Sequence, residues 1–141
     1  MREKIPDWER WFIQASDELE DARYNLEGGR YHLVCFLAQQ AAEKALKAFL
    51  YFNGAEEVWG HSLYALLEDA AAFDREFDPE EGRFRELPVL DKYYLSTRYP
   101  DVLAGGIPSR SFARWEAEKA LELAGELIDY LSKKLRREGD G

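Results

Sequence analysis

Three groups of polar residues have side chains that could hold a ligand or move a proton. The first group is a stripe of Gln40, Glu43, Lys44 and Lys47 in an otherwise alanine-rich segment. At helical spacing Gln40, Lys44 and Lys47 share a face, and Glu43 with Lys47 makes a favourable i,i+4 ion pair. The pattern fits a solvated helix face with one ordinary ion pair. It also fits a cationic surface that helps to hold an anion.

The other two groups are centred on single residues at predicted helix ends. His61 stands at a helix entrance, where histidine can pack or cap, but its near-neutral titration also permits acid–base or anion-binding work. Arg98 stands at a helix C-terminus, where a cation is favourable in itself. Its planar guanidinium is also suited to phosphate or carboxylate, beside a loop fixed by Pro100.

Other kinds of reactive site lack their residues in this sequence. Di-iron bundles need a glutamate three residues before a histidine, whereas Gly29 and Val58 precede His32 and His61 at that distance. No His-Glu-x-x-His motif, Gly-x-Ser-x-Gly elbow or Walker phosphate loop occurs. Cys35 falls on an apolar helix face and is interpreted as a small buried hydrophobe. We therefore predict no metal and no cofactor.

Helical periodicity predicts the elements that position these residues. Asp7 and Ser62 are predicted N-caps, and Asp78 is predicted to begin a helix that Gly82 makes irregular and Pro88 restarts. The prediction is an all-α, up-and-down antiparallel bundle of about five helices in one domain spanning 1–141. The wide apolar face of the second helix suggests that it is central or meets a second subunit. The first predicted helix begins at 7 and ends at the glycines at 28 and 29. The others span 30–53, 62–75, 78–98 and 112–136, and a loop is predicted over 101–111.

Composition and charge exclude several classes of protein. The 141 residues include 19 Lys and Arg against 28 Asp and Glu, and the net charge of −9 argues against binding of long nucleic acids. A hydrophobic content of 46% with 14% aromatics is too high for a disordered chain. No apolar run is long enough for a membrane span and no signal peptide is evident, so we expect a soluble cytoplasmic protein. The scarcity of Asn, Gln, Cys and Met resembles the composition of thermophile proteins.

Several stretches, taken in order, resemble the HEPN (higher eukaryotes and prokaryotes nucleotide-binding) domain family. The resemblance extends from about Trp8 to Leu135 and ends in a long helix. The matching stretches are 29–31, 37–48, 60–63 and 97–101.

The resemblance implies a helical bundle that forms a homodimer and has a cleft associated with nucleotides or RNA. It also implies a minimal nucleotidyltransferase as a partner, because many small prokaryotic members are encoded beside one and some pairs act as toxin and antitoxin. Carried over by motif, the cleft would contain Arg98, Tyr99 and Asp101. The secondary site residues would be Gln40, Glu43, Lys44, Lys47 and His61.

The sequence departs from the ribonuclease members of that family. Those members carry an arginine, four to six residues and then a histidine, but the positions after Arg98 hold Leu103, Ala104 and Gly105. Neither histidine has an arginine at the required distance before it. In that family the histidine is thought to deprotonate the ribose 2′-OH while the arginine stabilises the phosphorane. Without the histidine, we do not expect an efficient nuclease of that type.

The leading hypothesis is a non-catalytic protein that binds a nucleotide or a nucleotide-bearing partner, with Arg98 on the phosphate. Lys44, Lys47 or Lys92 would assist, and a tyrosine at 93, 94 or 99 would stack on the base or pack in the core. One alternative is a ribonuclease toxin with an altered site, in which His61 is the base for Arg98. The other is a structural dimerisation module that uses the broad face of the second helix.

Overall fold

The computed structural model describes residues 4–139, with side chains described for 4–135. Within that part of the chain there are five α-helices, four short 3₁₀ helices and no strand, so the all-α prediction is confirmed. The α-helices are α1 (Asp7–Glu27), α2 (Tyr31–Phe52), α3 (Leu63–Ala71), α4 (Tyr93–Ser96) and α5 (Arg114–Gly139). The 3₁₀ helices are η1 (Arg75–Phe77), η2 (Leu87–Lys92), η3 (Pro100–Val102) and η4 (Pro108–Arg110).

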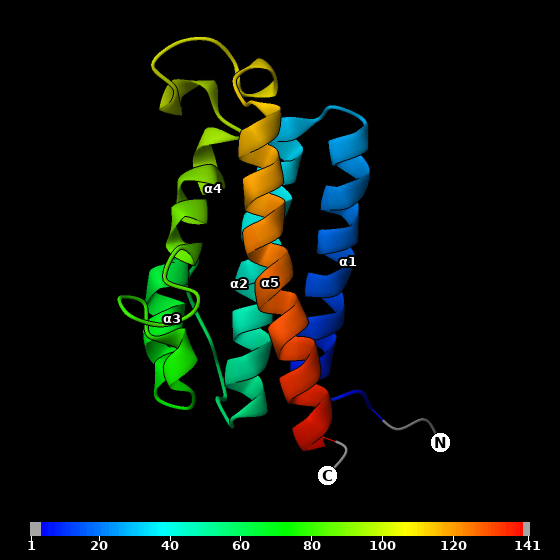
Figure 1. Ribbon diagram of the computed structural model, residues 1–141, viewed down its shortest axis with the longest axis vertical. Helices are drawn as coiled ribbons and strands as arrows, with labels where there is room; N and C mark the ends of the chain where they lie inside the picture. The colour runs from blue at the N-terminus through cyan, green and yellow to red at the C-terminus, as the bar shows by residue number, and fades with distance from the viewer. Residues whose placement is uncertain (1–3, 140–141) are drawn as a thin grey trace.

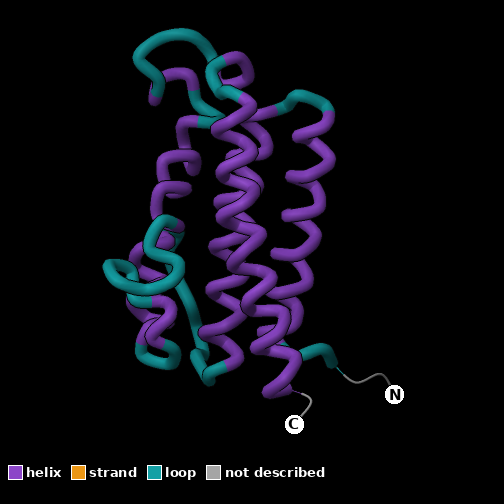
Figure 2. The backbone as a smooth tube through the Cα atoms, viewed as in Figure 1, coloured by secondary structure: helices purple, strands orange, loops and turns teal. Residues whose placement is uncertain are grey.

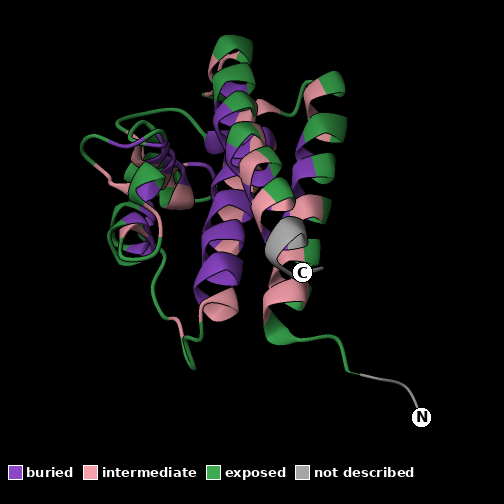
Figure 3. Cartoon of the chain, turned by 60° about the horizontal axis from the view of Figure 1, so that its bottom comes forward, coloured by how far each residue is buried: buried purple, intermediate pink, exposed green. Residues whose placement is uncertain are grey.

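The three long helices lie side by side, and the shorter elements cover one flank of them (Figures 1 and 2). α2 packs against α1, α5, α3 and α4, which makes it the central helix of the bundle. Burial follows this arrangement, because α2 is buried along most of its length while α1 and α5 keep an exposed face (Figure 3). Alanines such as Ala38, Ala41 and Ala45 are fully buried on α2, and their small side chains let the neighbouring helices approach closely.

The helix ends agree with the sequence at most positions. Ser62 caps α3 as predicted, because its hydroxyl accepts the backbone N–H of Ala65 at 3.2 Å. The predicted cap at Asp7 is wrong: Pro6 occupies the N-cap of α1, and Asp7 is the first helical residue. Between α1 and α2 the left-handed residue is Gly29, with φ of 74°, which allows the tight antiparallel connection.

The region after α3 differs most from the prediction. α3 ends at Ala71 instead of continuing to 75, and no helix begins at Asp78. The Asp78 carboxylate instead accepts the backbone N–H groups of Glu80 and Glu81 at 2.8 and 3.1 Å, which closes a turn. Helical structure resumes beside Pro88, as predicted, but as the 3₁₀ helix η2, which leads into the single turn of α4.

The stretch 101–111, which was predicted to be a loop, contains most of η3 and all of η4. α5 begins two residues later than predicted. Along the described chain, no helix combines the length and the apolar character that crossing a membrane requires.

Candidate functional site

Arg98 lies on a platform of aromatic rings just beyond the end of α4. Its Nε and Nη2 donate to the Tyr94 carbonyl at 3.0 and 2.6 Å, which fixes the guanidinium. The guanidinium carbon lies 4.6, 4.9 and 5.1 Å from the ring centres of Phe36, Tyr94 and Tyr99. The side chain is exposed, and no carboxylate of the described residues pairs with it. Its remaining N–H groups are therefore available to an anion.

His61 contacts the same platform from the segment that enters α3. Its Nδ1 lies 3.1 and 3.2 Å from the two carboxylate oxygens of Glu43, and its ring stacks on Tyr94 at 4.6 Å. Because a carboxylate only accepts hydrogen bonds, Nδ1 carries the proton of this contact. The imidazole is 56% exposed, so Nε2 is open to a ligand.

The structure therefore brings together two of the predicted site residues, His61 and Arg98, through the ring of Tyr94. Tyr99, also predicted, contributes an exposed ring beneath Arg98. Asp101 is exposed in η3, and within the described chain no hydrogen bond or ion pair joins it to Arg98.

The polar stripe of α2 is largely internal, so its interpretation as a solvated face is wrong. Glu43 and Lys47 are only 4% and 5% exposed, and the predicted ion pair between them is present at 3.2 Å. Lys47 also lies over the Trp11 ring at 5.5 Å. The charge of Lys47 is thus neutralised inside the bundle between α1 and α2.

Lys44 has a carboxylate partner as well. Its ammonium group pairs with the buried Glu18 at 2.5 Å and donates to Gln40 at 3.1 Å. Gln40 in turn donates to Gln39 at 2.7 Å. Of the predicted cations, Lys44 and Lys47 have carboxylate partners, whereas among the described residues no ion pair joins Arg98 or Lys92 to a carboxylate. Lys92 is exposed at the end of η2.

Sequence reasoning missed two residues that support this site, the buried Gln39 and the half-buried Asp91. The Gln39 amide donates to the His61 carbonyl at 3.1 Å and approaches Glu43 at 3.4 Å. Asp91, in η2, accepts the Leu63 N–H with both carboxylate oxygens at 3.0 and 2.9 Å, which ties η2 to the start of α3. Burial raises the pKa of Asp91. Gln39 stands next to the predicted stripe, whereas nothing in the periodicity distinguishes Asp91.

The single cysteine fits its interpretation from the sequence. Cys35 is fully buried as predicted, and burial raises the pKa of its thiol to about 12, so it is unreactive. Across the described residues, no three His, Cys, Asp or Glu side chains cluster in a way that could hold a metal ion.

This helical bundle has relatives among known proteins. A family model described as the HEPN domain matches residues 8–135. The crystal structure of TT1696 from Thermus thermophilus is 39% identical, with a TM-score of 0.80, over 93% of this chain and 100% of that one. The crystal structure of ST0689, an archaeal HEPN homologue, matches with 35% sequence identity and a TM-score of 0.73. This match covers 93% of this chain and 99% of that one. No curated protein matches the chain significantly.

Proposed function

The chain belongs to the HEPN domain family, and on that premise we propose that it is a non-catalytic member that binds a nucleotide beside Arg98. The observation that carries this proposal is the state of Arg98 itself. It is an exposed guanidinium, fixed by the Tyr94 carbonyl, seated on three aromatic rings and without a carboxylate partner in the described part of the chain.

The chemistry of this platform matches the two parts of a nucleotide. A guanidinium offers parallel N–H donors to phosphate oxygens. The exposed ring of Tyr99 offers a surface on which a base can stack, and the open Nε2 of His61 offers one further polar contact. Lys44 and Lys47 support the site from inside the bundle in this proposal, because their charges are already matched by carboxylates.

The residues that follow Arg98 support a role in binding over one in catalysis. The positions where ribonuclease members place their histidine hold Leu103, Ala104 and Gly105, none of which can accept a proton. A positioned general base contributes factors of about 10² to 10⁴ in rate, and this chain has none at that place.

Calorimetric titration with ATP, GTP and AMP tests the proposal. We expect saturable binding by the wild-type protein and a loss of about tenfold or more in Arg98→Ala, because charge-assisted hydrogen bonds to phosphate disappear. The matched control is Arg23→Ala, which removes an exposed arginine that is paired with Glu20 on α1. Absence of saturable binding, or an equal loss in both variants, would contradict the proposal.

A ribonuclease with an altered site is the second candidate, and the contact between Glu43 and His61 favours it. A carboxylate that holds Nδ1 of a histidine leaves Nε2 able to take a proton, and Arg98 lies against the same Tyr94 ring. Cleavage of a defined RNA by the wild-type protein, lost in both His61→Ala and Arg98→Ala, would favour this candidate. Residual cleavage that is equal in all three preparations would be contamination.

Family membership also leads us to propose a homodimer and a small nucleotidyltransferase partner. Light scattering of the purified protein tests the first, and co-purification with the product of a neighbouring nucleotidyltransferase reading frame tests the second. A monomer at all concentrations, or no such reading frame, would count against the respective proposal.

A further inference from the structure

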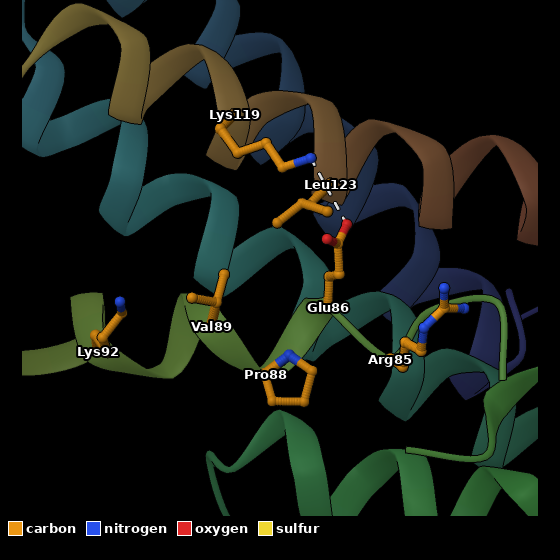
Figure 4. Close-up of a pocket in the computed structure, with 7 residues that line it drawn as sticks. All are labelled: Arg85, Glu86, Pro88, Val89, Lys92, Lys119 and Leu123. Carbon is orange, nitrogen blue, oxygen red and sulfur yellow. Dashed lines mark ion pairs between the residues drawn. The ribbon is translucent and has the colours of Figure 1, made fainter. Parts of the chain in front are cut away.

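A groove between η2 and α5 shares no residue with the Arg98 platform. Its volume is about 640 Å³, which lies within the range of roughly 300 to 1,000 Å³ that is usual for small-molecule sites. Figure 4 shows its side chains, which come from the turn before η2, from η2 itself and from α5. The lining residues are Arg85, Glu86, Pro88, Val89, Lys92, Lys119 and Leu123.

The floor of the groove is apolar because of how the two helices present their side chains. In a 3₁₀ helix, residues three apart lie above one another, so Val89 and Lys92 project to the same side. On α5, Lys119 and Leu123 are four apart and share a face. Val89 remains 40% exposed, whereas Leu123 is 6% exposed, so an apolar surface stays open to solvent between the charged ends.

The rim of the groove is positively charged in an otherwise acidic protein. The lining contains three cations, Arg85, Lys92 and Lys119, and one carboxylate, Glu86, although the chain as a whole has a net charge of −9. The Glu86 carboxylate reaches across the groove to Lys119, as Figure 4 shows, at 3.6 Å. Both side chains are largely solvated, at 69% and 48% exposed, so the pair is weak and easily replaced.

We propose that this groove binds a small amphipathic carboxylate, a medium-chain fatty acid in chemical class. The apolar chain lies over Pro88, Val89 and Leu123, and the carboxylate replaces that of Glu86 at Lys119. We base this assignment on Glu86, because the pairing of its carboxylate with Lys119 shows where the groove can hold a carboxylate.

Titration of the wild-type protein with decanoate, below its micelle concentration, is the first test. We expect saturable binding that strengthens about fourfold for each methylene from hexanoate through octanoate, until the groove is filled. Decanol and decyltrimethylammonium carry the same chain without an anionic head and should bind more weakly. No saturable binding, equal binding of the cationic amphiphile, or binding only to anionic lipid vesicles would overturn the proposal.

Variants at exposed positions give effects of opposite sign. Lys119→Gln should weaken decanoate binding about threefold, whereas Glu86→Gln should strengthen it by a similar factor because the internal competitor is gone. Val89→Ser should weaken binding about threefold or more through lost apolar contact. Lys133→Gln is the matched control, since Lys133 is an exposed lysine of α5 that pairs with Asp129.

The pattern across these variants decides the outcome. Arg98→Ala should leave decanoate binding unchanged, which separates this groove from the proposed nucleotide site. If Lys119→Gln and Glu86→Gln both match the control Lys133→Gln, or if both shift binding in the same direction, the carboxylate does not occupy the position of Glu86 and the proposal is wrong.

Discussion

The Glu43 carboxylate connects the interior of the bundle to its candidate site. It is buried, accepts from Lys47 at 3.2 Å on its own helix, and holds His61 at the surface by Nδ1 at 3.1 Å. A buried charge that loses its partner is costly, since neither water nor another group replaces the lost interaction. Substitutions at this position will therefore change both stability and the orientation of His61.

The two members of the buried pair should respond differently to removal. Glu43→Ala leaves the Lys47 ammonium group buried without its carboxylate, and we expect a loss of about 3 to 5 kcal/mol in the free energy of unfolding. Lys47→Met should cost less, because Glu43 keeps His61 and the methionine chain keeps an apolar contact with Trp11. Urea unfolding followed by circular dichroism measures both. Equal losses in the two variants would contradict the unpaired-charge explanation.

Asp74 should make stability depend on pH through its contact with Tyr130. Burial alone would raise the pKa of Asp74, but hydrogen bonds from the Tyr130 hydroxyl at 2.5 Å, from the Glu76 N–H and from Lys134 outweigh it and lower that pKa. A carboxylate with a lowered folded-state pKa contributes stability above its unfolded pKa, and this contribution is lost as pH falls through the folded pKa.

Tyr130→Phe removes the hydroxyl donor, so the pKa of Asp74 should rise. We expect a loss of about 1 to 2 kcal/mol at pH 7, and a smaller difference from the wild-type protein in acid, where Asp74 is protonated in both. Tyr64→Phe is the control, because Tyr64 donates to Glu80 at an exposed position and should cost little. Urea unfolding at pH 7 and in acid measures the loss in each variant. A loss in Tyr130→Phe that does not depend on pH would contradict the linkage.

Among the helices and turns, the sequence predicted what depends on local pattern. The periodicity predicted the ends of α1, α2 and α5 to within three residues, and the Ser62 cap of α3 is present. It failed after α3, because the path there is set by packing of a turn and a 3₁₀ helix against the long helices. The same reason applies to the site. Arg98 and His61 were identifiable by type, but the bond from the Leu63 N–H to Asp91, just after His61, forms only when η2 packs on α3.

The turn before η2 depends on the absence of a side chain at Gly82. A Cβ placed there would lie 2.4 Å from the Glu76 carbonyl oxygen and 2.6 Å from that of Asp78. Because both are backbone atoms, Gly82→Ala should destabilise the fold by about 1 to 3 kcal/mol. Gly105→Ala, where a Cβ would meet nothing within 4 Å, should be close to neutral. Thermal unfolding compares them, and similar midpoints would show that the turn can shift without cost.

Across the protein as a whole, the excess of acidic residues limits how many phosphates it can hold. Most lysines whose side chains are described face a carboxylate, either inside the bundle as Lys44 and Lys47 do or at its surface as Lys119 and Lys133 do. The Arg98 platform is a local cationic surface on a chain of net charge −9. We therefore expect the protein to bind one short anionic ligand in preference to the continuous backbone of a long polynucleotide.

This distribution predicts how nucleotide binding depends on salt and on ligand length. If Arg98 alone contacts phosphate, the logarithm of the binding constant should fall against the logarithm of salt concentration with a slope of about −1. A long homopolymer should bind no more tightly per site than the mononucleotide, because a chain of net charge −9 disfavours the additional phosphates. Calorimetric titration over a series of salt concentrations, with AMP and with polyadenylate, measures both quantities. A slope several times steeper, or affinity that grows steadily with length, would require an extended basic track.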